Sequence, residues 1–83
     1  MVTKTTVIKK IVCDGKKQYR LTYNLLTEHD SKYGMEVICQ WRNVTETEQI
    51  QIGSNRNDAL RILRLFAKES VFPVALLETW ENL

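Results

Sequence analysis

The sequence predicts an α+β fold, in which a four-stranded antiparallel β-meander is covered on one face by an amphipathic helix and a short C-terminal helix (ββββαα). Apolar and polar residues alternate as in strands over about residues 5–53, and apolar residues then recur with the spacing of a helix. The length supports the same conclusion. With 83 residues, 43% of them hydrophobic, residues 1–83 form a single domain whose small core leaves little room for an enclosed active site.

The first two strands are predicted to form a hairpin. Val7–Cys13 is rich in β-branched residues and ends at Asp14-Gly15, a pair that suits the positive φ angles of a type I′ turn. The next strand places alternate apolar residues on one face: Tyr19, Leu21, Tyr23 and Leu25. A two-residue turn would set Leu21 opposite Ile8, whereas a three-residue turn would flip the register, and both registers stay open.

Two further strands follow the polar segment 28–32. The third strand has one apolar face, made of Tyr33, Met35, Val37, Cys39 and Trp41. The fourth strand, about Thr45–Ile52, starts with polar residues. That start favours an edge position or a strand end that projects past the core.

The first helix is expected at about residues 55–69. Ser54 and Asn55 are candidate N-caps, and Asp58 in the first turn complements the helix dipole. One arc of the helix is apolar, with Ala59, Leu60, Ile62, Leu63, Phe66 and Ala67. The opposite side carries Arg61, Arg64 and Lys68. Leu65 lies outside the apolar arc, so it is either covered by the last segment or available to a partner.

The second helix is expected at about residues 73–82. Proline fits the first helical position, because its missing N–H has no partner there anyway, and Pro73 therefore predicts the start of this helix. Its predicted apolar side consists of Val74, Leu76, Leu77, Trp80 and Leu83.

The charge is unevenly distributed, although the net charge is only +2. Residues 1–32 carry seven basic side chains against three acidic ones, and residues 70–83 carry two acidic side chains and no basic one. Solubilising surface charge explains most of this pattern. The distribution still makes the first hairpin basic and the C-terminus acidic.

The two cysteines, Cys13 and Cys39, are predicted to be free thiols and small buried hydrophobic residues. A closed zinc site needs about four N or S ligands, and these cysteines with the single histidine offer only three. We therefore expect no metal and no cofactor. The N-terminus lacks the apolar segment of a secretory signal, and no apolar run is long enough to span a membrane, which favours a cytoplasmic protein.

No residue pattern predicts catalysis. A Ser or Cys nucleophile needs a base within hydrogen-bond reach, and His29 lies in a polar segment between Glu28 and Asp30, where a solvated histidine is the simpler interpretation. Gly15, Gly34 and Gly53 each stand alone at a predicted turn rather than in a phosphate-binding loop. We expect a protein that is not an enzyme.

Several segments resemble a family of small clostridial (Gram-positive) proteins known only as a domain of unknown function. They are Gly15–Tyr19, Tyr33–Glu36, Gln51–Arg56 and Val71–Glu78. The resemblance covers roughly residues 7 to 83, and its motifs are turn and packing residues. It implies a bacterial or mobile-element protein of the cytoplasm with no known activity, and it brings no functional residues with it.

Two kinds of binding remain as hypotheses. A small protein often acts by covering a site on a larger one, and Trp41, Trp80, Tyr33 and Leu65 are candidate anchors. The specific version is a phage or mobile-element inhibitor that covers the nucleic-acid-binding surface of a host factor. The alternative is direct nucleic-acid binding by the basic hairpin and helix face, if both face the same way, with stacking on Tyr19 or Trp41.

Of the two hypotheses, we expect binding to another protein. Pairing of strand edges would also permit a homodimer. The candidate residues for a protein or nucleic-acid partner are Lys9, Lys16, Lys17, Arg20, Arg56, Arg61, Arg64, Leu65 and Lys68.

Overall fold

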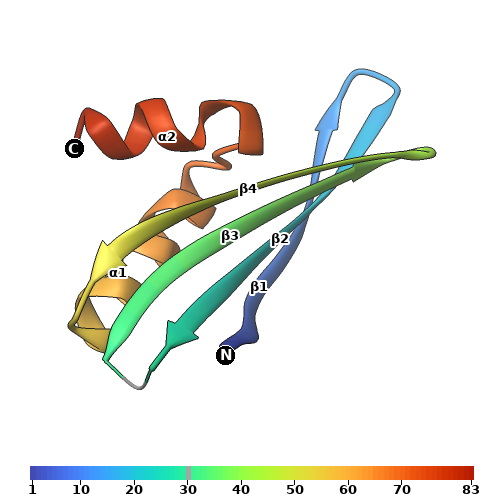
Figure 1. Cartoon of the computed structure of the whole chain (residues 1–83). Helices are drawn as coiled ribbons and strands as arrows, with labels where there is room; N and C mark the ends of the chain where they lie inside the picture. Colours follow the sequence, from blue (N-terminus) through green and yellow to red (C-terminus); the bar gives the residue numbers. More distant parts are fainter. Residues whose placement is uncertain (30) are drawn as a thin grey trace.

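The computed structural model describes residues 1–29 and 31–83 and confirms the predicted ββββαα order. Its elements are β1 (Val2–Asp14), β2 (Lys17–Glu28), β3 (Lys32–Trp41), β4 (Val44–Gly53), α1 (Arg56–Lys68) and α2 (Pro73–Glu81). The strands form one open sheet in the order β1-β2-β3-β4, and every neighbouring pair is antiparallel (Figure 1). β4 is an edge strand, in agreement with its polar start. None of the described helices is long and apolar enough to cross a membrane.

The two faces of the sheet have different roles. The covered face packs against the helices and carries Leu21, Tyr23, Leu25, Met35, Val37, Cys39 and Ile50, which form the core with Ala59, Leu63, Phe66 and Leu76. Side chains alternate between faces, so the cross-strand pairs place Lys9, Ile11, Arg20, Thr22, Glu36 and Gln40 on the other face. None of the described elements packs on this second face, here called the open face. The molecule is thin, with extents of 41 × 27 × 17 Å.

The turn of the first hairpin corrects the predicted register. Leu21 lies opposite Lys10 rather than Ile8, so the register expected from a two-residue turn at Asp14-Gly15 was wrong by two residues. The turn does have two residues, but they are Gly15 and Lys16, flanked by the pair Asp14–Lys17. Only Gly15, with φ of 63°, takes a positive φ there, as the first central position of a type II′ turn requires. This shift by an even number leaves Ile8–Asp14 on their predicted faces, whereas the irregularity between Thr6 and Ile8 reverses the faces of Val2–Thr6.

Gly34 permits a close approach between β3 and β4. A Cβ atom at this position would collide with the backbone carbonyl of Ile50. The register of β3 and β4 also shifts between Tyr33 and Gly34, which places an extra residue in β4. Glycine is therefore required here by space.

α1 begins and ends with standard caps. Asn55 is the N-cap, and its side-chain oxygen accepts a 3.0 Å hydrogen bond from the N–H of Asp58, as the sequence predicted. At the other end Ser70 adopts a left-handed φ of 54°, and the N–H of Val71 donates to the carbonyl of Phe66 at 3.0 Å. This is a Schellman motif, and it brings Val71 into the core.

Tyr23 connects this end of α1 to the sheet. Its buried hydroxyl donates a 2.9 Å hydrogen bond to the carbonyl of Val71. Burial, with a smaller contribution from Cys39, raises the pKa of Tyr23 to about 12, so the hydroxyl remains a neutral donor.

The predicted apolar side of α2 is partly wrong. Leu76 and Pro73 are buried and Trp80 is half-buried, but Val74 and Leu77 are 85% and 56% exposed, and Leu83 is exposed as well. The helix carries apolar residues around most of its circumference. Only the side with Pro73, Leu76 and Trp80 meets the sheet, so its apolar pattern alone could not identify the buried side.

The cysteines lie on opposite faces of the sheet. Cys39, opposite Leu21, is buried as predicted, and burial followed by the charge of Glu46 raises the pKa of its thiol. Cys13, opposite Gln18, is exposed on the open face, so the prediction that it is buried was wrong. Both are free thiols.

Candidate functional site

The basic face of α1 is exposed, as the helical periodicity predicted. Arg61, Arg64 and Lys68 reach solvent on the side away from the sheet, with Leu65 42% exposed beside them, and Arg56 is exposed in the first turn of the helix. Of these cations, only Arg61 has a nearby carboxylate among the described residues, Asp58 at 3.8 Å. Such an exposed pair contributes little stability. The last segment therefore does not cover Leu65.

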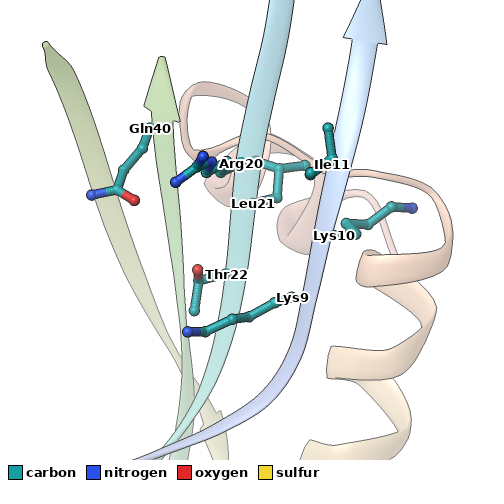
Figure 2. A pocket seen from close by; sticks show the side chains of 7 residues that line it. All are labelled: Lys9, Lys10, Ile11, Arg20, Leu21, Thr22 and Gln40. Atoms are coloured by element: carbon teal, nitrogen blue, oxygen red, sulfur yellow. The ribbon is translucent and has the colours of Figure 1, made fainter. Parts of the chain in front are cut away.

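The basic hairpin does not form one patch, because its cations project to both sides of the sheet. Lys9 and Arg20 lie on the open face. Lys10 lies on the covered side, where its ammonium group donates to the carbonyl of Ala67 at 2.9 Å and to the hydroxyl of Ser70 at 2.7 Å. Figure 2 shows Lys9 and Lys10 extending to opposite sides of β1.

The remaining cations of the hairpin have different surroundings again. Lys16 lies in the exposed turn. Lys17 is directed to the covered side and lies over the ring of Trp41, 5.0 Å from its centroid, while Arg42 lies at the same distance from that ring. The candidate residues from the sequence therefore separate into three places: the outer face of α1, the open face, and the hairpin tips.

The α1 cations and the open-face cations lie on opposite sides of a thin molecule. α1 packs on the covered face, and its cations point away from it, whereas Lys9 and Arg20 project from the other face. The hypothesis of direct nucleic-acid binding required the basic hairpin and the basic face of α1 to lie on the same side of the molecule. The geometry does not provide that single surface.

The aromatic residues proposed for base stacking lie on the covered side. The ring of Tyr19 packs against that of Trp41 at a tilt of 37° with centroids 5.9 Å apart, and it meets the ring of Phe72 edge-on with centroids 5.3 Å apart. Tyr19 and Trp41 are half-buried. This cluster fixes the segment before α2 on the sheet.

A polar network crosses all four strands of the open face, and its central member is Glu36. This carboxylate is only 1% exposed and accepts hydrogen bonds from Lys4, Asn24 and Gln49 at 2.9, 2.9 and 2.7 Å. Thr6 extends the network by donating to Asn24 at 2.7 Å. Burial alone would raise the pKa of Glu36, but the three hydrogen bonds and the charge of Lys4 outweigh it, and the pKa is lowered. The sequence indicated no such site, because Glu36 appeared there as an ordinary polar position of an alternating strand.

The outer face of α2 is the other feature that sequence reasoning missed. Val74, Leu77, Glu78 and Glu81 are all exposed, and at 100° per residue they fall within an arc of about 100°. We call these four residues the α2 stripe. It combines two aliphatic side chains with two carboxylates, and no basic residue occurs anywhere in residues 70–83.

His29 has the exposed character that the sequence suggested. Its side chain is 71% exposed, and its Nε2 atom lies 3.8 Å from a carboxylate oxygen of Glu28. Asp30, the other acid considered beside it, lies outside the described residues. Over the described part of the chain, no three His, Cys, Asp or Glu side chains gather as metal ligands would.

The model of DUF6514, a family of unknown function, matches residues 3–83. No curated protein and no solved structure matches the chain.

Proposed function

Since this chain belongs to DUF6514, a family of unknown function, we propose a function from its surfaces: it is a small non-enzymatic binding protein that acts by protein–protein interaction through the α2 stripe. The exposure of Val74 and Leu77 supports this proposal most directly. The fold already has a core residue in α2 at Leu76 and gains nothing from two further aliphatic side chains in water. Exposed aliphatic groups beside charged ones are typical of a surface that a partner covers.

The charge of the stripe restricts the chemistry of the partner. Glu78 and Glu81 flank the aliphatic pair, so a suitable partner presents an apolar patch bordered by Lys or Arg. The finer form of the proposal is a bacterial, cytoplasmic inhibitor, encoded by a phage or other mobile element, that covers a basic nucleic-acid-binding surface of a host factor. The small size and the acidic C-terminal segment are consistent with that form.

The test compares capture of proteins from a nuclease-treated bacterial lysate by three tagged chains. They are the wild type, Val74→Ala/Leu77→Ala, and Val2→Ala, which shortens an exposed aliphatic side chain at the start of β1. We expect a protein that the wild type and Val2→Ala retain equally and that the α2 variant retains about tenfold less, the loss typical of an interface anchor. Capture that is unaffected by the α2 variant would contradict the proposal.

The inhibitor form has its own experiment. A labelled oligonucleotide bound to the captured protein should be displaced by this chain and not by Val74→Ala/Leu77→Ala. If the captured protein binds nucleic acid equally well with and without this chain, the inhibitor form is wrong, although the binding function stands.

Direct nucleic-acid binding is the second candidate, and the exposed cations on the outer face of α1 favour it. Titration with duplex and single-stranded DNA at two salt concentrations tests this alternative. Salt-sensitive binding that is lost in Arg61→Ala/Arg64→Ala would support it, because phosphate contacts release counterions. An absence of binding even at low salt would exclude it.

A further inference from the structure

The open face contains a groove at its hairpin end. One part of the groove, about 540 Å³, has walls formed by Lys9, Ile11, Arg20, Thr22 and Gln40, with Lys10 and Leu21 completing the lining. A second part of about 350 Å³ shares Arg20 and Gln40 and continues to Gln18 and Arg42. The two parts therefore form one depression that crosses β1, β2 and β3. Figure 2 shows its side chains on neighbouring strands, with Lys9 extending across β2 toward Thr22.

The groove is positively charged and its cations are available. Lys9 and Arg20 are exposed, and neither has an ion-pair partner among residues 1–29 and 31–83. The nearby carboxylate on this face, Glu36, already accepts from Lys4, Asn24 and Gln49, so it cannot also neutralise the groove. A ligand with its own negative charges complements this site.

The centre of the groove combines apolar and polar groups. Ile11 lies directly opposite Arg20 and is 60% exposed, and Gln40 lies opposite Arg20 on the other side. The amide of Gln40 and the hydroxyl of Thr22 both donate and accept hydrogen bonds, as does a peptide backbone. The matching ligand thus carries carboxylates, an aliphatic side chain and exposed amides.

The placement of the aromatic residues argues against nucleic acid in this groove. The chain has three Tyr, two Phe and two Trp. All lie in the core or pack against the covered side, with Trp41 packed against Tyr19. Sheets that bind single-stranded nucleic acid present aromatic rings on which the bases stack. Over residues 1–29 and 31–83, the open face offers none.

We propose that this groove binds a short, extended acidic segment of a protein, with carboxylates at Lys9 and Arg20 and an aliphatic residue against Ile11. The site lies on the opposite side of the sheet from the α2 stripe, so it is a second binding surface that stands independently of the function proposed above. A chain with both surfaces would bridge two proteins or hold one partner at two points.

The test uses fluorescence anisotropy with a labelled peptide that alternates Glu with Thr around a central Leu. A peptide with Gln in place of Glu and an oligothymidylate of equal length are the comparison probes. We expect the acidic peptide to bind more tightly than both, and its affinity to fall with added salt. In Lys9→Ala/Arg20→Ala the dissociation constant should rise about tenfold or more, the loss expected for two charge-assisted contacts.

The matched control is Arg61→Ala/Arg64→Ala, which removes the same charge from the opposite side of the molecule and should change the affinity by less than about twofold. Val74→Ala/Leu77→Ala should also retain peptide binding, which separates this test from that of the α2 stripe. All these side chains are exposed, so circular dichroism should show an unchanged fold. Failure of the acidic peptide to bind at low salt would overturn the proposal. So would an equal loss of peptide affinity in Lys9→Ala/Arg20→Ala and Arg61→Ala/Arg64→Ala, or equally tight binding of oligothymidylate.

Discussion

Glu36 shows how a charged residue is accommodated on a sheet face that no element covers. Its three donors come from the three other strands, Lys4 from β1, Asn24 from β2 and Gln49 from β4. A buried carboxylate is costly unless its oxygens are satisfied, and here both oxygens accept hydrogen bonds. The network therefore holds the four strands in one register.

The lowered pKa of Glu36 makes stability depend on pH. A carboxyl whose pKa is lower in the folded state than in the unfolded state stabilises the protein at pH values above its ordinary pKa of 4.5, and that stability is lost as pH falls through the folded pKa. We expect the free energy of unfolding from urea denaturation to fall as the medium is acidified below that value.

Substitution of Glu36 identifies the source of this dependence. Glu36→Gln should lower stability near neutral pH by about 2–3 kcal/mol, because the new amide N–H groups face the donors of Lys4 or Gln49, and should weaken the acid dependence. Glu48→Gln, at an exposed position of β4, serves as the control and should change stability by less than about 0.5 kcal/mol. Equal pH profiles for the wild type and Glu36→Gln would show that Glu36 is not the cause.

At the scale of elements, the C-terminal end of α1 depends on a residue from a distant strand. Lys10 of β1 donates to the last turn at Ala67 and to Ser70, which holds the left-handed position that follows the helix. A cation at this end also interacts favourably with the helix dipole. β1 is thus attached to the helical layer by this side chain.

Lys10 and Lys9 form a matched pair for testing this attachment. Lys10→Met should lower the free energy of unfolding by about 1–2 kcal/mol, because it removes a charge-assisted hydrogen bond to the carbonyl of Ala67 at the end of the helix. Lys9→Met changes the same charge on the open face and should be within about 0.5 kcal/mol of the wild type. Equal effects of the two substitutions in chemical denaturation would contradict the assignment of these neighbours to opposite faces.

The elements also show what the sequence could and could not predict. Strand alternation located the covered face correctly, and the cap at Asn55 and the proline at the start of α2 located the helices. The hairpin register was wrong because Asp14-Gly15 permits more than one turn, and the choice depends on which position needs a positive φ. The buried side of α2 could not be identified because its apolar residues extend around the helix, and only contact with the sheet decides among them.

At the scale of the whole molecule, the arrangement of charge could not be read from the sequence. Basic residues close together in the chain, such as Lys9 and Lys10, separate to opposite faces when the strand forms. The acidic and aliphatic residues of α2 instead gather on one outer face. The molecule therefore presents an apolar and acidic stripe on its helical side and a basic groove on its open side, where the sequence suggested one basic region and an acidic tail.

The central claim is that a protein partner covers the α2 stripe, and methyl NMR of the chain with and without its captured partner tests it most directly. Val74 and Leu77 should shift or broaden on binding, while the methyl groups of buried Leu63 should change far less. Observation of these positions requires no substitution, so a folding defect cannot imitate the result. Unchanged Val74 and Leu77 resonances in a complex saturated with partner would contradict the claim.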